Sequence, residues 1–176
     1  KQTSGFQCKQ GNMISAKAPG LYNGILSLFH VVSYLTTKKE LKQFFLNCNR
    51  HLLQEGLLVF DVWYTPAVEY TPPEVKVKKM KNSKLQVVRL TEPKIDSKNK
   101  CVDVNFTIFS KKTSGSLWSK NKETHRMRHY SKQEIYSVAK EFGFKLIKNE
   151  EFLSSKPLSK HTWGACFVFR KMKNLT

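Results

Sequence analysis

Two apolar strand patterns with a capped helix between them constrain the fold of this chain more than any other feature. The strand patterns cover residues 22–28 and 57–63, and both are nearly continuous apolar runs. Such runs are typical of strands that are buried on both faces of a parallel sheet. Thr37 and Glu40 have the spacing of a capping box, which predicts a helix that starts there and ends at Gly56. This order of strand, helix and strand predicts an α/β fold.

Polar and aromatic residues gather where both predicted strands end. In open α/β sheets, ligands bind outside the carboxyl ends of the strands. The predicted rim contains Phe29, His30, Tyr34, Asp61, Trp63 and Tyr64. Any one of these aromatic residues is equally well explained as part of the hydrophobic core. Their coincidence at two successive strand ends is what favours a ligand-binding rim.

The pattern changes between residues 74 and 130. Four strand-like segments, separated by turns rich in Lys, Asn, Ser and Gly, cover residues 75–79, 85–90, 102–109 and 124–130. They predict an antiparallel β-meander inserted into the α/β domain. Ser131 and Glu134 then repeat the capping-box spacing and predict a second helix that ends at Gly143. Two last strands, over residues 144–147 and 163–170, are expected to form an edge hairpin with a short loop.

The first residues predict a further strand-like segment in the core. Residues 6–10 alternate weakly and end at a turn that begins with Gly11. The chain enters this segment almost at once and begins without a methionine, so we expect it to lack the front of a longer protein. The expected organisation is a partial core over residues 1–73, the meander over 74–130, and a C-terminal helix and hairpin over 131–176 that complete the core.

Charge and composition limit the classes of partner. The 176 residues are 40% hydrophobic, which suits one domain with a buried core. The net charge of +18 favours an anionic partner. However, only five of the 31 basic residues are Arg, and no basic run is longer than two residues. Base readout and bidentate phosphate contacts favour Arg, so we expect no specific binding of nucleic acid.

The four cysteines indicate a reduced protein without a metal site. None of them forms a Cys-x-x-Cys pair, and Cys48 and Cys166 fall in apolar patterns typical of buried thiols. The sequence has no signal peptide and no apolar run of membrane-spanning length. We therefore expect a cytoplasmic protein with no membrane partner. A homodimer is left open.

Three groups of residues resemble a known family. The turn Gly11-Asn12-Met13, the segment 22–30 and the segment 51–61 resemble the second half of a class I S-adenosylmethionine-dependent methyltransferase. Residues 61–66, the meander and residues 124–130 are similar to the sugar-nucleotide N-methyltransferases, which methylate the amine of a nucleotide-linked aminosugar. The resemblance implies an incomplete Rossmann-like sheet. Of the seven strands in the order 3-2-1-4-5-7-6, this chain would supply strands 3 to 7.

The resemblance also implies a cofactor, S-adenosylmethionine, a small-molecule acceptor and a set of site residues. The residues implied to contact the cofactor are Gly11, Asn12, Met13, Ser27, Leu28, Phe29 and His30. Those implied to contact the acceptor are Trp63, Tyr64, Arg126 and Arg128. Those expected to orient the acceptor amine or take its proton are Tyr34, His125 and His30. A plain turn, a core edge and a solvated strand face are the structural alternatives for these positions.

The chain departs from the family pattern on the cofactor side. It has no glycine-rich cofactor loop and no acidic residue for the ribose hydroxyls, and Asn12 and Asn23 stand where relatives carry Asp. Half of the cofactor site is therefore expected to be missing, and this chain alone is expected to be inactive. Two further functions stay open: a basic binding module that does no chemistry, and a degenerate remnant of the enzyme that serves as an interaction protein.

Overall fold

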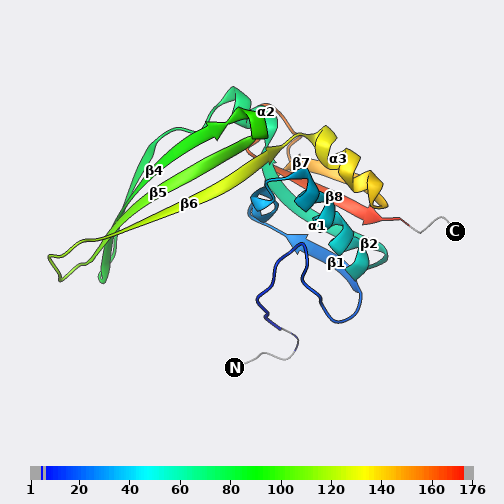
Figure 1. Ribbon diagram of the computed structural model, residues 1–176, viewed down its shortest axis with the longest axis horizontal. Coiled ribbons are helices and arrows are strands. Elements are labelled where there is room, and N and C mark those ends of the chain that lie inside the picture. Colours follow the sequence, from blue (N-terminus) through cyan, green and yellow to red (C-terminus); the bar gives the residue numbers. More distant parts are fainter. Residues whose placement is uncertain (1–4, 6, 173–176) are drawn as a thin grey trace.

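The computed structural model describes residue 5 and residues 7–172. It consists of an α/β core from which a long antiparallel ribbon extends (Figure 1). The core holds β1 (Tyr22–Ser27), η1 (Val31–Tyr34), α1 (Lys38–His51), β2 (Leu52–Tyr64), α2 (Thr65–Tyr70), α3 (Lys132–Glu141), β7 (Phe144–Glu151) and β8 (Gly164–Lys171). The ribbon holds β3 (Lys76–Lys81), β4 (Leu85–Asp96), η2 (Ser97–Asn99), β5 (Cys101–Lys112) and β6 (Ser119–Tyr130). No helix among the described residues is long and apolar enough to cross a membrane.

The core sheet has the strand order β1-β2-β8-β7. β1 runs parallel to β2, and β8 runs antiparallel to both of its neighbours. This is the order expected for strands 4-5-7-6, so the predicted open α/β sheet is confirmed. The expectation of a strand at residues 6–10 is wrong for its described part, because residues 7–10 form no regular structure and pair with no strand.

Helix α1 begins as the sequence predicts. The Thr37 hydroxyl accepts a hydrogen bond from the Glu40 N–H at 3.1 Å, and the Glu40 carboxylate accepts one from the Thr37 N–H at 2.9 Å. These two bonds satisfy N–H groups that the first turn leaves free. The helix then buries Phe44 and Phe45 against the sheet, where both rings pack edge-on against Phe60 at centroid distances of 5.6 and 5.8 Å. This aromatic cluster fixes α1 on one face of β2.

The end of α1 differs from the prediction. The helix stops at His51 and β2 begins at the next residue, so Gly56 does not close the helix but lies inside β2. A Cβ atom at Gly56 would lie 2.9 Å from the Leu53 carbonyl oxygen and 3.2 Å from that of Asn23. Glycine is needed there because two backbone segments approach closely, which a sequence pattern does not distinguish from a helix end.

The second face of the sheet and its β1 edge carry exposed apolar side chains. Leu26 pairs with Val59 across the two parallel strands, so both side chains point to the face opposite α1. Leu26 is 68% exposed although it lies in a buried-strand pattern. Among the described residues, β2 is the only strand that pairs with β1. The core sheet therefore has one covered face and one face that is largely open in the described part of the chain.

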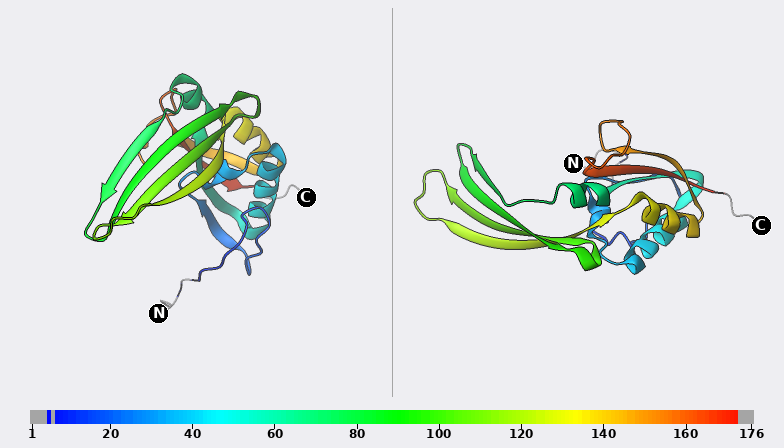
Figure 2. Two further views of the ribbon diagram at one scale, coloured as in Figure 1. Left: turned by 60° about the vertical axis from the view of Figure 1, so that its left-hand side comes forward. Right: turned by 90° about the horizontal axis from the view of Figure 1, so that it is seen from above.

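The ribbon is the predicted antiparallel meander. β3, β4, β5 and β6 pair in sequence order, and each predicted segment is longer in the structure than in the prediction. Figure 2 shows that the ribbon curves away from the core. It is joined to the core sheet by two parallel pairs between β2 and β6, Trp63 with His129 and Tyr64 with Tyr130. The Tyr130 hydroxyl also donates a hydrogen bond to the Leu35 carbonyl, directly after η1.

The C-terminal elements agree with the prediction in part. The Ser131 hydroxyl caps α3 by accepting from the Glu134 N–H at 3.2 Å. The Glu134 carboxylate lies 2.6 Å from Arg128 instead, so only half of the second capping box forms. β7 and β8 form the predicted antiparallel hairpin. The connection between them spans residues 152–163, which is longer than the short loop that was expected. It reaches the turn that follows β1.

Candidate functional site

The turn at the end of β1 holds two residues in a left-handed conformation. Phe29 has φ of 65° and His30 has φ of 62°, which is uncommon for residues other than glycine. The His30 N–H donates to Asp61 Oδ2 at 3.0 Å, and His30 Nδ1 lies 2.5 Å from the same oxygen. Asp61 is fully buried in β2. One buried carboxylate therefore holds both the backbone and the ring of His30, and this explains why the turn keeps its unusual conformation.

The ring of His30 is also enclosed by the β7–β8 connection and by the start of β8. A Cβ atom at Gly164 would lie 2.9 Å from His30 Cε1, so the imidazole occupies the space that a side chain at this position would take. The Phe152 ring lies 6.1 Å from His30 and 5.7 Å from Phe29. Phe29 itself is 72% exposed. The turn thus presents an aromatic ring outward and holds an imidazole inward.

Tyr34 and His125 meet although 91 positions separate them in the sequence. The Tyr34 hydroxyl lies 2.6 Å from His125 Nδ1, and His125 Nε2 lies 3.4 Å from a carboxylate oxygen of Glu123. In the tautomer whose Nε2 carries the proton, Nδ1 accepts from the tyrosine hydroxyl and Nε2–H points to the carboxylate. The three groups form a chain through which a proton can pass from a bound molecule toward solvent.

A cleft of about 460 Å³ lies between the core and the ribbon. The core side contributes Trp63 and Trp163, whose rings meet edge-on at 5.8 Å. The ribbon side contributes Phe106 and Arg89, with the guanidinium 5.0 Å above the Phe106 ring. Arg89 Nε is buried and has no hydrogen-bond partner among the described residues. Glu74 and Lys76 also line the cleft, so it offers apolar aromatic walls, two cationic groups and one carboxylate, a combination that suits a ring-bearing polar molecule.

Phe106 links this cleft to the tyrosine–histidine pair. Its ring lies 5.4 Å from that of His125, and the pairing of Val104 with His125 places both side chains on the face of the ribbon that forms the cleft. Trp63 is also tied to η1, because its backbone N–H donates a hydrogen bond to the Ser33 hydroxyl at 2.9 Å. The structure therefore brings Tyr34, His125 and the Trp63 wall into one region, as expected from the sequence.

A second hollow, of about 580 Å³, lies on the far side of Tyr34. It is lined by the predicted cofactor turn, Gly11–Met13, and by the residues Gln10, Ile14, Tyr34, Leu35 and Glu40. Asn12 shapes this turn, because its side-chain oxygen accepts from the Ile14 N–H at 3.1 Å. Asn47 of α1 fixes the turn by donating to the Met13 carbonyl at 3.0 Å. Asn12 thus has the structural role of a turn residue, and Tyr34 borders both this hollow and the ribbon.

Ser27 and Leu28 lie half-buried at the carboxyl end of β1, where the sequence places them. Ser27 pairs with Phe60 of β2, so the backbone leads directly from the sheet into the left-handed turn at Phe29. Their place at a parallel strand end is the position at which ligands of open α/β sheets bind.

Three predicted acceptor contacts are not supported by the geometry. Tyr64 points opposite to Trp63 and packs against the main core, because successive strand residues face opposite sides. The Arg126 guanidinium lies 2.5 Å from Asp96 and 2.9 Å from Asp103. Arg128 is largely buried against Glu134. Both guanidinium groups are paired with carboxylates within the protein, so neither offers an unpaired charge for the predicted diphosphate contact.

Ion pairing and burial shift the pKa of several groups around the site. Hydrogen bonds from Asn99 and Arg126 lower the pKa of Asp96 to about 2, which keeps this carboxylate charged beside Arg126. Burial lowers the pKa of His129, which lies 3.0 Å from the Thr65 hydroxyl under the cleft. Burial also raises the pKa of the Cys166 thiol, next to Asp61 across the sheet.

Four residues of this region were not identified from the sequence: Phe106, Arg89, Phe152 and Trp163. Phe106 stands in the period-two pattern of β5, which does not say whether its face is a core or a cleft. Arg89 is the only Arg between residues 51 and 125, a stretch rich in Lys. This exception could have predicted a position at which a guanidinium is needed. The Asp61–His30 pair joins two predicted rim residues whose contact depends on the left-handed turn.

Comparison with known proteins identifies the fold. No family model matches the chain, and no curated protein matches its sequence. Solved structures do match, and one is an S-adenosylmethionine-dependent methyltransferase from Clostridium acetobutylicum, with 15% identity, a TM-score of 0.75, and coverage of 93% of this chain and 63% of that chain. The sugar N-methyltransferase KedS8 from a Streptoalloteichus species matches with 14% identity, a TM-score of 0.78, and coverage of 97% of this chain and 64% of that chain. DesVI from Streptomyces venezuelae matches with 18% identity, a TM-score of 0.72, and coverage of 91% of this chain and 63% of that chain. The chain therefore has the fold of these methyltransferases, and it spans just under two thirds of their length.

Proposed function

We propose that this chain forms the acceptor side of an S-adenosylmethionine-dependent methyltransferase that methylates the amine of a small molecule such as a nucleotide-linked aminosugar. The fold agrees with such an activity, and one matching structure is a sugar N-methyltransferase. The observation that carries the proposal is the Tyr34–His125 hydrogen bond, placed between the hollow at Gly11–Ile14 and the aromatic cleft. A methyl donor on one side of Tyr34 and an acceptor on the other would meet there.

The residues around the junction have distinct roles in this proposal. The bound cofactor supplies an electrophilic methyl group, and transfer requires the acceptor lone pair in line with it at about 3 Å. Trp63 and Phe106 hold the acceptor against the ribbon and exclude water from it. The Tyr34 hydroxyl orients the amine, and His125 takes up the proton that the amine loses and passes it toward Glu123. His30 is held inward by Asp61 and supports the turn that carries Phe29.

The residues present fit one side of a cofactor site. Phe29 stands exposed after the carboxyl end of β1, where it can cover a bound cofactor, and Gly11–Ile14 form a fixed turn beside Tyr34. The β1 edge and the exposed Leu26 leave room for further strands of the sheet. We propose that the ribose and methionine contacts come from such strands. The 176-residue chain is then expected to bind S-adenosylmethionine only weakly, which titration calorimetry can measure.

Variants of the full-length protein test the proposed roles. His125→Ala is expected to lower kcat by about 100-fold or more, the usual effect of removing a general base, while the dissociation constant of the cofactor changes by less than about twofold. Tyr34→Phe is expected to have a smaller effect of the same kind, since it removes one hydrogen bond. His161→Ala, at an exposed histidine outside the site, is the matched control. An unchanged kcat in His125→Ala would contradict the proposed proton route.

A non-catalytic binding module is the second candidate. One observation favours it: the outer part of the ribbon is strongly basic and carries exposed apolar residues. A full-length protein that binds no cofactor and methylates no amine, yet keeps this surface, would support a scaffold that descends from an enzyme.

A further inference from the structure

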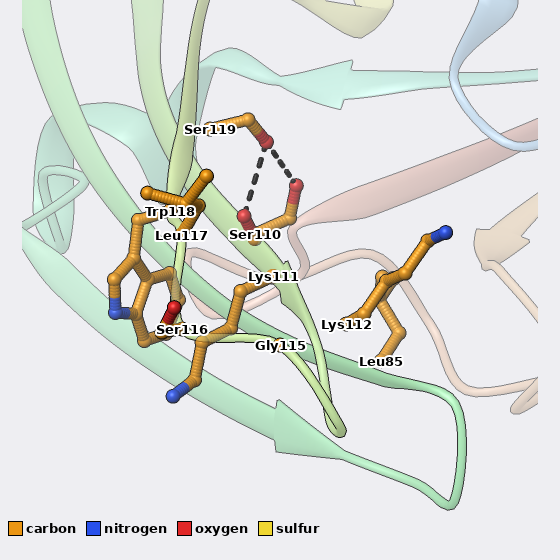
Figure 3. A pocket seen from close by; sticks show the side chains of 9 residues that line it. All are labelled: Leu85, Ser110, Lys111, Lys112, Gly115, Ser116, Leu117, Trp118 and Ser119. Atoms are coloured by element: carbon orange, nitrogen blue, oxygen red, sulfur yellow. Dashed lines mark hydrogen bonds between the residues drawn. The ribbon is translucent and has the colours of Figure 1, made fainter.

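The free end of the ribbon is built from two turns that are tied together. The β3–β4 turn and the β5–β6 turn meet there, because the Thr113 N–H donates to the Lys84 carbonyl and its hydroxyl to the Asn82 carbonyl, both at 3.0 Å. Ser110 and Ser119 close the base of the second turn with a hydroxyl–hydroxyl contact of 2.8 Å (Figure 3). The end of the ribbon is therefore one connected structure and not two independent loops.

This end exposes large apolar side chains. Leu117 is 88% exposed and Trp118 is 48% exposed, and both border a shallow hollow of about 560 Å³ (Figure 3). Leu85, at the start of β4, lines the same hollow and is also exposed. Together these three residues form what we call the apolar tip. Exposed apolar side chains gathered in one place mark a contact surface, since single scattered ones are the usual case.

The outer parts of the strands behind the apolar tip contain basic residues and no acidic ones. Between Glu74 and Glu92, and again between Asp103 and Glu123, the sequence has no acidic residue. These two stretches contain ten basic residues: Lys76, Lys78, Lys79, Lys81, Lys84, Arg89, Lys111, Lys112, Lys120 and Lys122. The acidic residues of the meander strands lie in the half of the ribbon that is nearer the core. The outer half of the ribbon therefore has a strong positive potential.

Strand register places half of these basic residues on one face. Lys79 pairs with Val88, which pairs with Phe109, which pairs with Lys120, so all four share a side of the ribbon. The same alternation adds three more lysines and defines the lysine face: Lys79, Lys81, Lys111, Lys120 and Lys122. No residue of the lysine face has a carboxylate within salt-bridge distance in the described part of the chain. It lies opposite the face that carries Phe106 and Arg89, and so it is separate from the cleft.

We propose that the lysine face and the apolar tip dock the protein on the surface of an anionic phospholipid membrane. Lysine ammonium groups attract acidic headgroups, and Leu117 and Trp118 can insert at the level where amphipathic aromatic rings prefer to lie. The proposal is independent of the methyltransferase activity. It departs from the expectation of no membrane partner, which rested on the absence of an apolar segment of spanning length and does not concern a surface contact.

The same face is poorly suited to nucleic acid. Single-stranded nucleic acid binds to aromatic rings by base stacking, which needs a free ring face. Here Lys111 lies 5.1 Å above the Trp118 ring and Lys120 lies 5.6 Å above the Phe109 ring. The lysine face also contains no Arg, the residue that makes bidentate phosphate contacts. A lysine occupies one face of each ring and the charges are compact ammonium groups, which favours a fluid surface of acidic headgroups over stacked bases.

Vesicle binding tests the proposal. The purified chain is mixed with vesicles of phosphatidylcholine alone or with about one third phosphatidylserine, and bound protein is measured by sedimentation at low and physiological salt. We expect binding only to the anionic vesicles and weaker binding at higher salt. Trp118 fluorescence is expected to shift to shorter wavelength in Trp63→Phe/Trp163→Phe, which leaves Trp118 as the only tryptophan.

Two variants separate the contributions of charge and apolar contact. Lys111→Gln/Lys120→Gln is expected to lower the partition coefficient by about 30-fold, and Leu117→Ser/Trp118→Ser is expected to abolish the binding that remains at physiological salt. Lys140→Gln/Lys156→Gln removes the same charge from the core and is expected to bind like the parent chain. An unchanged melting temperature shows that each variant is folded.

Two results would overturn the proposal. One is equal weakening of vesicle binding by the core and ribbon lysine pairs, which would mean attraction by net charge alone. The other is absence of binding to anionic vesicles. If a single-stranded oligonucleotide then binds and Lys111→Gln/Lys120→Gln abolishes that binding, the surface belongs to nucleic acid.

Discussion

Gly164→Ala tests whether the His30 ring sets the residue allowed at the start of β8. The added Cβ would lie 2.9 Å from His30 Cε1, which is 0.5 Å short of ordinary van der Waals contact at 3.4 Å, and 3.2 Å from Phe152 Cβ. The ring cannot easily retreat, because Asp61 holds both its Nδ1 and the backbone N–H. Overpacking of this kind costs about 1–3 kcal/mol. We expect a loss near the middle of that range, about 2 kcal/mol.

Urea denaturation followed by circular dichroism measures this loss, which for a chain of this size corresponds to a fall in Tm of about 4–8 °C. Gly24→Ala is the matched control, because its Cβ would lie at an ordinary 3.7 Å from the Leu57 carbonyl oxygen. A double-mutant cycle with His30→Asn isolates the contact, since Asn tolerates the left-handed conformation and is smaller than the imidazole. If Gly164→Ala costs as much in the His30→Asn background as in the parent chain, the clash with the ring is not the cause.

Two further predictions concern titratable groups. Burial lowers the pKa of His129 in the folded state below its ordinary value of 6.5, so the unfolded chain binds a proton first on acidification. We therefore expect the free energy of unfolding to fall as the pH drops below about 6.5, and His129→Gln to flatten this part of the pH profile measured by urea denaturation. Burial raises the pKa of Cys48 to about 12, whereas Cys8 is exposed. Iodoacetamide at neutral pH is expected to label Cys8 rapidly and Cys48 only after unfolding, as mass spectrometry would show; rapid labelling of native Cys48 would contradict the buried environment.

Local sequence signals predicted local structure well. Thr37 and Glu40 act on each other within one helical turn, so their spacing alone identified the start of α1. The alternation around Val104 likewise identified an antiparallel strand. The Gly56 prediction failed because the carbonyl groups that require a glycine come from Leu53 and from another strand. The pattern of residues along the chain does not show where two backbone segments approach each other this closely.

The site could be predicted only in part for the same physical reason. The order of strands placed Tyr34 and Trp63 at neighbouring strand ends, and the return of the meander brought His125 to Tyr34. The ion pairs of Arg126 could not be predicted, because Asp96 and Asp103 become its neighbours only through strand register. The lysines of the ribbon look scattered in the sequence, and register alone collects five of them on one face.

The narrow junction between the ribbon and the core makes the ribbon a lever. In the described part of the chain, two residue pairs join β6 to β2, yet β6 is twelve residues long and extends about 40 Å from that point. A rotation of about 5° at the junction would move the far end by about 3.5 Å, but the level of Phe106, which pairs with Glu123, by only about 2 Å. The cleft has one wall on each side of this pivot, Trp63 on the core and Phe106 on the arm. A change in the angle of the ribbon would therefore change the width of the cleft, and the Tyr34–His125 and Tyr130–Leu35 hydrogen bonds both tie the ribbon to the region of η1.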